Sequence, residues 1–312
     1  MKNNLPYRVL LYYKYVNISD HEIYAKHHLK FCTALGVKGR IIIAGEGING
    51  TLSGTKDQTD AYIYAMKMDP RFQKMEFKID EADGHVFKKL YVRPKKEIVT
   101  LNLEEDIDPN QLTGKHLQPA DFLEAMENED VVIIDARNDY EYDLGHFRNA
   151  IRPDVRNFKE FPQWVRENKE RFEGKKILAY CTGGIRCEKF SGLLLKEGLS
   201  DVNQLKGGII NYSKDPQTRG SMFEGKCYVF DERISVDINK AEPYQIVSKC
   251  FHCGEPCDRY VNCAQLECHA QFLCCEECDV KTKRSCCEEH KNSERNEYNI
   301  KEHESKEREA AL

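Results

Sequence analysis

The sequence predicts a mixed α/β and α+β protein made of three successive parts, and three observations support this. Residues 1–95 alternate strand-like and helix-like runs in the order βαββαβ. The middle of the chain carries short, fully apolar runs followed by helix-like runs, the pattern of a parallel sheet covered on both faces. Ten of the fourteen cysteines lie within residues 250–287. A chain of 312 residues has room for two or three domains.

The first part, residues 1–95, is predicted to be a ferredoxin-like or acylphosphatase-like module. Its strands are expected over 7–15, 38–44, 51–53, 76–79 and 87–92. The first helix should begin with Ser19 as its N-cap and end at Gly36, and the second should span 56–68. The glycine-rich stretch 45–50 indicates either a phosphate-binding loop or a hairpin turn that needs positive φ.

The charge of the chain is unevenly distributed. Residues 1–95 contain 16 Lys and Arg against 10 Asp and Glu, a net charge of +6, whereas the whole chain carries −5. A basic module on an acidic protein favours a polyanionic partner such as RNA. The candidate RNA-binding residues are Tyr13, Lys14, Arg40 and Asn49. Because a strand alternates its faces, about half of the aromatic residues near Tyr13 must instead belong to the core.

A linker is expected over 96–118 and a second domain over 119–220. Within that domain, the apolar strand 176–180 leads through a short loop into a helix, and this loop carries the main candidate catalytic residues: Cys181, Arg186 and Cys187. Backbone N–H groups and the helix dipole at such a loop lower the pKa of a thiol below about 8.5. Cys181 is therefore the candidate nucleophile and Arg186 a candidate anion partner. Cys187 either resolves an oxidised Cys181 or caps the helix from a buried position.

Four strings in this domain resemble the rhodanese pattern over about residues 120–215. They are D-x-R at 135–137, E-Y-x-x-G-H-F-x-N-A at 141–150, the Cys181–Arg186 loop, and K-G-G at 206–208. The resemblance implies a cysteine that carries a persulfide or attacks an electrophile. It also implies that Asp135, Arg137 and His146 support the loop, with structural roles favoured over catalytic ones. An arginine-loop phosphatase is disfavoured, because its loop has one more residue than the four between Cys181 and Arg186.

Two longer strings, G-E-G-I-N-G-T-L-S-G at 45–54 and C-T-G-G-I-R-C-E-K at 181–189, resemble the tRNA uridine(34) hydroxylase family. This resemblance extends over residues 5–280. It implies an oxidoreductase that forms 5-hydroxyuridine at wobble position 34, in the anticodon loop of tRNA. It also implies molecular oxygen as co-substrate and a cysteine-dependent step at Cys181, with an unknown reductant. The alternative is a rhodanese-type sulfurtransferase that carries a persulfide on Cys181.

The third part, residues 221–290, is predicted to bind metal. Two C-x2-C pairs, Cys250/Cys253 and Cys275/Cys278, are separated by 21 residues, which is close to the spacing of zinc ribbons and treble clefs. These four cysteines are the expected ligands of a structural Zn²⁺. The neighbouring Cys and His residues would supply a second tetrahedral site, with the pairing of ligands left open: Cys257, Cys263, Cys268, His269, Cys286, Cys287 and His290.

The remaining expectations concern the tail and the cellular compartment. The charged tail, 291–312, should be a solvated helix or disordered. No apolar run approaches the ~20 residues of a membrane helix, and the N-terminus lacks an apolar signal core. A cytoplasmic, membrane-independent protein is therefore expected, in which reduced cysteines act as nucleophiles or metal ligands.

Overall fold

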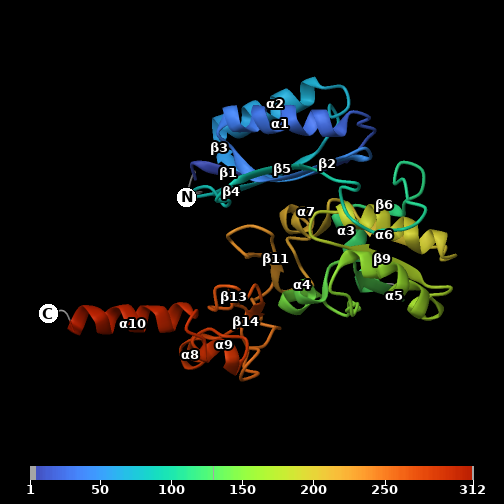
Figure 1. The fold of residues 1–312 in the computed structure, drawn as a ribbon. Helices are drawn as coiled ribbons and strands as arrows, with labels where there is room; N and C mark the ends of the chain where they lie inside the picture. Colours follow the sequence, from blue (N-terminus) through green and yellow to red (C-terminus); the bar gives the residue numbers. More distant parts are fainter. Residues whose placement is uncertain (1–4, 129, 311–312) are drawn as a thin grey trace.

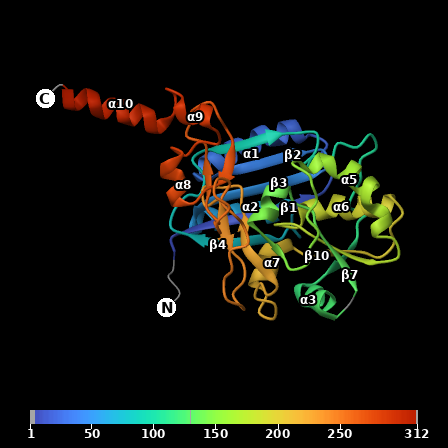
Figure 2. The same cartoon turned by 90° about the horizontal axis from the view of Figure 1, so that it is seen from below.

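The computed structural model describes residues 5–128 and 130–310, and for 306–310 the backbone alone. It has the three predicted parts (Figure 1). The N-terminal module lies against the central domain through its sheet, and its two helices lie on the far side of that sheet. The cysteine-rich segment packs on the opposite side of the central domain, and the last helix projects away from the body (Figure 2).

The N-terminal module is a five-stranded sheet covered on one face by α1 (His21–Leu35) and α2 (Lys56–Met68). Its strands are β1 (Tyr7–Tyr15), β2 (Lys38–Ala44), β3 (Gly47–Thr55), β4 (Phe77–Ala82) and β5 (Leu90–Pro94). The order β4-β1-β3-β2-β5, antiparallel except where β5 joins β2, confirms the predicted βαββαβ fold with β5 as an added edge strand. Along β1, Leu10 and Tyr12 are buried beneath the helices, whereas Leu11 and Tyr13 lie on the open face.

One local prediction for this module was wrong, and another was wrong in its extent. The first helix has Asp20 at its N-cap and no side-chain capping bond, so Ser19 does not form the expected capping box. The stretch 45–50 is not one loop, because β3 already begins at Gly47 and only residues 45–46 connect it to β2. The glycines serve close approach instead: a Cβ at Gly50 would lie 2.4 Å from the Tyr12 hydroxyl. The hairpin interpretation is therefore the correct one, with Gly47 at φ 151°.

The central domain contains the predicted parallel sheet, in the order β6-β10-β9-β7. Its strands are β6 (Lys115–Leu117), β7 (Val131–Asp135), β9 (Lys176–Tyr180) and β10 (Val202–Leu205). Its α-helices are α3 (Pro119–Asn128), α4 (Asp139–Leu144), α5 (Phe161–Asn168), α6 (Ile185–Lys196) and α7 (Gly208–Lys214). Successive residues of β9 enter two different core clusters, Ile177 and Ala179 on one face and Leu178 and Tyr180 on the other, so both faces of the sheet are covered.

The connecting and C-terminal segments complete the fold. Between β5 and β6 the chain forms no helix or strand, yet Leu101 and Ile107 are buried in the core of the central domain. A small antiparallel sheet joins β8 (Gly145–Phe147), β11 (Phe223–Tyr228) and β12 (Ser235–Asp237). The cysteine-rich segment contains the hairpin β13 (Tyr260–Asn262) and β14 (Gln271–Leu273), then α8 (Glu276–Lys281) and α9 (Glu288–Asn292).

The charged tail forms α10 (Glu297–Ala310), the first of the two predicted states, and residues 311–312 lie outside the described part of the chain. Within 5–128 and 130–310, no helix combines the length and the apolar character needed to cross a membrane.

The close approach of β2 and β3 at Gly39 provides a stability test. A Cβ at Gly39 would lie 2.3 Å from the Thr51 carbonyl oxygen and 2.6 Å from the Leu52 Cα. Gly39→Ala should therefore destabilise the N-terminal module by roughly 1–3 kcal/mol, measured as a lower thermal midpoint in circular dichroism. Gly84→Ala is the matched control, because no atom lies within 4 Å of a Cβ there. Equal midpoints for the two variants would contradict this interpretation.

Candidate active site between the N-terminal sheet and the cysteine loop

The loop that carries Cys181 is fixed by backbone hydrogen bonds. It leaves β9 at Tyr180 and enters α6 through Gly184, the N-cap residue, at φ 99°. The Gly184 N–H donates to the Cys181 Sγ at 3.1 Å. From the start of α7, the Ile209 N–H donates to the Cys181 carbonyl at 3.0 Å. Gly208 permits this approach, since a Cβ there would lie 2.4 Å from that carbonyl oxygen, which explains the K-G-G string.

The surroundings of Cys181 favour its thiolate. Burial raises the pKa of the thiol, but hydrogen bonds from Cys187 and Gly184 and the charge of Arg186 outweigh it, and the pKa falls to about 6. Burial and the adjacent Cys181 raise the pKa of Cys187 well above its usual value. The structure therefore brings the two thiols together: Cys187 keeps its proton at neutral pH and donates it to the Cys181 thiolate in a hydrogen bond.

Arg186 already has a partner within the protein. Its guanidinium forms a bidentate pair with Glu141 of α4, with Nη–Oε distances of 2.6 and 2.9 Å. The Glu141 side chain is fully buried and that of Arg186 is 10% exposed. Sequence reasoning missed Glu141, although it begins the E-Y-x-x-G-H string. Arg186 thus lowers the pKa of Cys181 through its charge while Glu141 holds it in place.

The predicted supporting residues separate into two groups. Arg137 and Asp135 form a fully buried pair, with Nη2–Oδ2 at 2.6 Å, and Arg137 also donates to the Gly145 carbonyl at 2.7 Å. This pair lies beneath Tyr180, whose ring centroid is 5.7 Å from the Arg137 guanidinium. His146 instead stacks on Tyr142, with 3.9 Å between ring centroids, and its Nδ1 lies 2.9 Å from the Tyr142 carbonyl oxygen. The structure does not bring His146 to the loop.

A cavity of about 510 Å³ separates the cysteine loop from the open face of the N-terminal sheet. Cys181 and Arg186 line it from the central domain, and Tyr13, Arg40 and Asn49 line it from the sheet. Three of the four predicted RNA-binding residues thus share a cavity with the candidate nucleophile. Asn49 also donates to the Ile98 carbonyl of the connecting segment at 3.1 Å.

Although it lines the cavity, Cys181 has no exposed surface, because the sheet presses on the loop. A Cβ at Gly183 would lie 3.0 Å from the Leu11 side chain, and one at Gly184 would lie 3.0 Å from the Tyr13 hydroxyl. The absence of side chains at Gly183 and Gly184 therefore leaves room for Leu11 and Tyr13 of the N-terminal sheet to pack against the loop. A substrate reaches the thiol only if atoms of this cover move.

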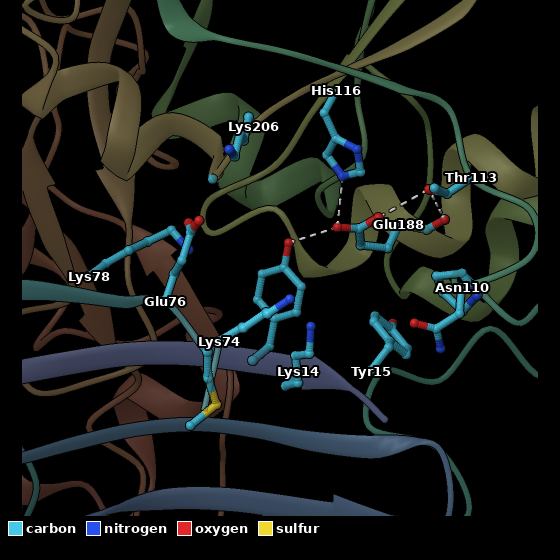
Figure 3. Close-up of a pocket in the computed structure, with 14 residues that line it drawn as sticks. Lys14, Tyr15, Lys74, Glu76, Lys78, Asn110, Thr113, His116, Glu188 and Lys206 are labelled. Atoms are coloured by element: carbon cyan, nitrogen blue, oxygen red, sulfur yellow. Dashed lines mark hydrogen bonds and ion pairs between the residues drawn. The ribbon is translucent and has the colours of Figure 1, made fainter. Parts of the chain in front are cut away.

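A second cavity, of about 270 Å³, also has Tyr13 in its lining and is rich in lysine (Figure 3). Lys14, Lys74, Lys78 and Lys206 line it, so Lys14 is separated from the three residues of the larger cavity. Glu188 Oε1 accepts one hydrogen bond from the Tyr13 hydroxyl at 2.9 Å and lies 3.0 Å from His116 Nε2.

Lys78 is the most unusual residue of this second cavity. It is only 7% exposed. Glu76 and Glu188 line the same cavity, but within the described ranges no carboxylate lies close enough to Lys78 to form an ion pair. Burial lowers its pKa to about 8. Its ammonium lies 5.3 Å from the centroid of the Tyr13 ring. Burying a charged lysine without a close ion pair is costly, so Lys78 is a candidate contact for an anion.

A buried ion cluster connects the N-terminal module to α6. Lys189, which is fully buried, lies 2.8 Å from Glu46, 2.8 Å from Glu97 and 2.9 Å from Asp106. The three carboxylates could by themselves hold a metal ion. The Lys189 ammonium takes that place, so we interpret this cluster as structural.

The four predicted metal ligands also lie together. One ligand atom from each of Cys250, Cys253, Cys275 and Cys278 lies within 4.8 Å of all the others. The Cys275 N–H points at the Cys250 Sγ at 3.5 Å, and the Cys278 N–H points at the Cys275 Sγ at 3.5 Å. Four thiolates in this arrangement fit a tetrahedral structural zinc site.

An acylphosphatase-like module joined to a rhodanese-like domain and a cysteine-rich end defines a class of multidomain rhodanese proteins. The matching family descriptions agree: "UPF0176 acylphosphatase like domain" at residues 7–98, "Rhodanese-like domain" at 118–215 and "Rhodanase C-terminal" at 224–291.

Relatives over nearly the full chain identify the family. A Bacillus licheniformis protein is 62% identical over 97% of this chain and 93% of its own length. Proteins from Bacillus cereus and Bacillus velezensis are each 60% identical, over 96% and 95% of this chain and 94% and 92% of their own lengths. All three are named tRNA uridine(34) hydroxylase. The chain belongs to the tRNA uridine(34) hydroxylase family.

The lowered pKa of Cys181 can be measured by alkylation. Since only the thiolate reacts with iodoacetamide, the rate at Cys181, followed by peptide mass spectrometry, should be half-maximal near pH 6. It should fall at lower pH. Cys187→Ala removes a hydrogen bond to the thiolate and should raise the midpoint by roughly one pKa unit.

Cys32→Ser, in the core of the N-terminal module, is the matched control and should leave the midpoint unchanged. A midpoint near that of a free thiol in the unmodified protein would contradict the assigned thiolate.

Proposed function

We propose that this protein hydroxylates uridine 34 of tRNA, using molecular oxygen and a cysteine-dependent step at Cys181. One observation carries the proposal. A stabilised thiolate lies in the wall of a cavity closed by a basic sheet, in a chain 60–62% identical to proteins named tRNA uridine(34) hydroxylase. The activity belongs to the oxidoreductase class, and its tRNA substrate makes the cytoplasm the expected compartment.

The larger cavity is the proposed site for the uridine base. A volume of about 510 Å³ falls within the range of small-molecule sites. Tyr13 offers an aromatic face, and Arg40 and Asn49 offer hydrogen-bond donors from the same wall. Position 34 lies in a loop whose bases are already unpaired, so turning one base into the cavity costs little.

The lysine-rich cavity is the proposed site for the RNA backbone next to that base. Four lysines line it, and Lys78 has no carboxylate partner in the described part of the chain. Tyr13 lines both cavities, so a base and its neighbouring phosphate would both bind next to this side chain. A phosphate oxygen would supply the anionic partner that Lys78 lacks.

The proposed chemistry starts at C6 of the uracil ring. The Cys181 sulfur forms a bond to C6, and the electrons of the C5=C6 bond move toward the C4 carbonyl as an enolate. C5 then becomes the nucleophilic carbon at which oxygen is introduced. One oxygen atom enters the product, and two protons and two electrons from an external reductant convert the other to water. Loss of the C5 proton to solvent, together with departure of the Cys181 sulfur from C6 as a thiolate, restores the C5=C6 bond, and Cys187 stabilises that thiolate by a hydrogen bond.

A sulfurtransferase with a persulfide on Cys181 is the second candidate, favoured by the match to rhodanese-like domains over 118–215. That activity needs only the central domain and gives no role to the sheet that covers the loop. Thiosulfate and cyanide distinguish the two: robust formation of thiocyanate, without hydroxylation of tRNA, would favour the sulfurtransferase.

The proposed nucleophile is tested with purified protein, unmodified tRNA, a chemical reductant and ¹⁸O₂. Nucleoside mass spectrometry should detect 5-hydroxyuridine containing one ¹⁸O atom, and Cys181→Ser should abolish it. Cys32→Ser should retain the activity. In parallel, tRNA from cells that lack the protein should lose 5-hydroxyuridine and its derivatives. A Cys181→Ser protein with normal rates would refute the adduct.

The proposed phosphate site is tested by tRNA affinity. Lys78→Met removes the charge at similar volume and should weaken binding roughly tenfold, the effect of one lost charge-assisted hydrogen bond. The slope of log affinity against log salt should become shallower by about 0.7–0.9. Lys30→Met, on an exposed position of α1 in the helical layer, is the matched control. The same affinity and slope for both variants would rule out this site.

A further inference from the structure

A second group of metal-binding side chains lies beside the predicted one. Ligand atoms of Cys263, Cys268, Cys286 and His290 all lie within 4.8 Å of one another. The Sγ atoms of Cys268 and Cys286 are 3.8 Å apart, and His290 Nδ1 lies 3.7 and 3.2 Å from the Sγ atoms of Cys263 and Cys286. A tetrahedral zinc ion with Zn–S bonds of about 2.3 Å has S–S edges of about 3.8 Å and S–N edges of about 3.5 Å.

We propose that the cysteine-rich segment binds two Zn²⁺ ions in an interleaved arrangement, the second held by Cys263, Cys268, Cys286 and His290. Along the chain, ligand pairs alternate between the sites. Cys250 and Cys253 belong to the first site, and Cys263 and Cys268 belong to the second. Cys275 and Cys278 then complete the first site, and Cys286 and His290 complete the second. Each ion therefore closes a loop that contains half of the other ion's ligands, so the sites form together.

The composition of this segment supports metal over free thiols. Its two strands have three residues each, and α8 and α9 have six and five. In its buried cluster, every buried residue except Val261 and Phe272 is a cysteine. Little apolar surface is therefore available to fold it, which is the situation in which a structural metal supplies the missing stability.

The chemistry of the donors selects the metal and excludes the other uses of these thiols. The 3.8 Å separation of Cys268 and Cys286 is far from the roughly 2.05 Å of a disulfide. Three thiolates and one imidazole with tetrahedral spacing are a donor set typical of structural zinc. Since all four positions are occupied by protein atoms, the second ion has a structural role.

The β13–β14 hairpin packs against α4, the helix whose Glu141 pairs with Arg186. The Tyr260 hydroxyl of β13 donates to the Tyr140 carbonyl of α4 at 2.8 Å, and Tyr228 donates to Gln271 of β14 at 2.8 Å. Leu273 of β14 also packs in one cluster with Leu144 of α4. Tyr140 precedes Glu141, the partner of Arg186. The two ions therefore act as positioning elements for the charge that lowers the pKa of Cys181.

The proposal is tested by metal analysis of the full-length protein, independently of its activity. Mass-spectrometric elemental analysis should find two zinc ions per chain. His290→Ala and Cys268→Ser should reduce this to one or fewer, and the remaining ion should be lost faster to a chelator, because the sites are interleaved. Cys287→Ser is the matched control: Cys287 is exposed, adjacent to Cys286 and outside both clusters, and the variant should retain two ions.

A rescue variant separates metal binding from misfolding. His290→Cys offers a fourth thiolate and should restore the second ion, and the Co²⁺-substituted protein should then show stronger thiolate-to-metal absorption. In His290→Ala, the alkylation midpoint of Cys181 should rise relative to Cys287→Ser, whereas His290→Cys should restore it. One zinc ion per chain in the unmodified protein, iron in place of zinc, or two ions retained in His290→Ala would overturn the proposal. An unchanged Cys181 midpoint in His290→Ala would overturn the positioning role.

Discussion

One buried ammonium group, that of Lys189, determines how the N-terminal module meets the central domain. Its three carboxylate partners come from the β2–β3 hairpin and from two points of the connecting segment. Loss of Lys189 would leave three carboxylates facing one another without their cation, and such a loss from a buried ion cluster costs about 3–5 kcal/mol. The cluster therefore fixes the distance between the sheet and α6, and with it the width of the cavity at Cys181. It also explains why the strings at 45–54 and 181–189, far apart in sequence, occur in one chain: Glu46 and Lys189 are direct partners.

Because the N-terminal sheet packs against the central domain, the two faces of β1 make different contacts. Tyr12 faces the helices and hydrogen-bonds Tyr62 in the core, whereas Tyr13, one residue later, faces the central domain and donates to Glu188. A strand whose two faces are both committed cannot shift its register without losing one of them. The Cys181 thiolate, the Glu141–Arg186 pair and the covering sheet thus form one connected structure rather than a catalytic domain with an appended RNA-binding module.

Much of this arrangement is predictable from local sequence. The order of strands and helices follows from short-range patterns and is confirmed. The loop at Cys181 and the grouping of the four cysteines also follow from such patterns; the four cysteines lie together, and the catalytic and metal-binding roles stay predictions. Strand alternation also predicted that some aromatic residues near Tyr13 would be core, as Tyr12 is. The errors at Ser19 and at 45–50 arose because cap and turn preferences are weak. At 45–50, the Tyr12 side chain packs directly against Gly50 within β3, and a local turn pattern does not contain that contact.

The parts that sequence could not supply depend on contacts between distant residues. Glu141 is 45 positions from Arg186, and no local pattern joins them. The burial of Lys78 depends on the meeting of two domains. The choice of His290 over His269 for the second cluster follows from the path of the chain after β14. His146 shows the converse: a motif position predicted to support the loop instead stacks on its neighbour Tyr142.

The cover over Cys181 has a consequence for the chemical stability of its thiolate. A thiolate with a pKa near 6 is the form most readily converted to sulfenic acid and then irreversibly to sulfinic and sulfonic acids. Because Cys181 has no exposed surface, peroxide and other small reagents reach it only when atoms of the cover move, and its oxidation between turnovers is slowed. The sheet that would hold the RNA thus also preserves the nucleophile. A substrate large enough to displace that cover would expose the thiol only when the correct reaction partner is already bound.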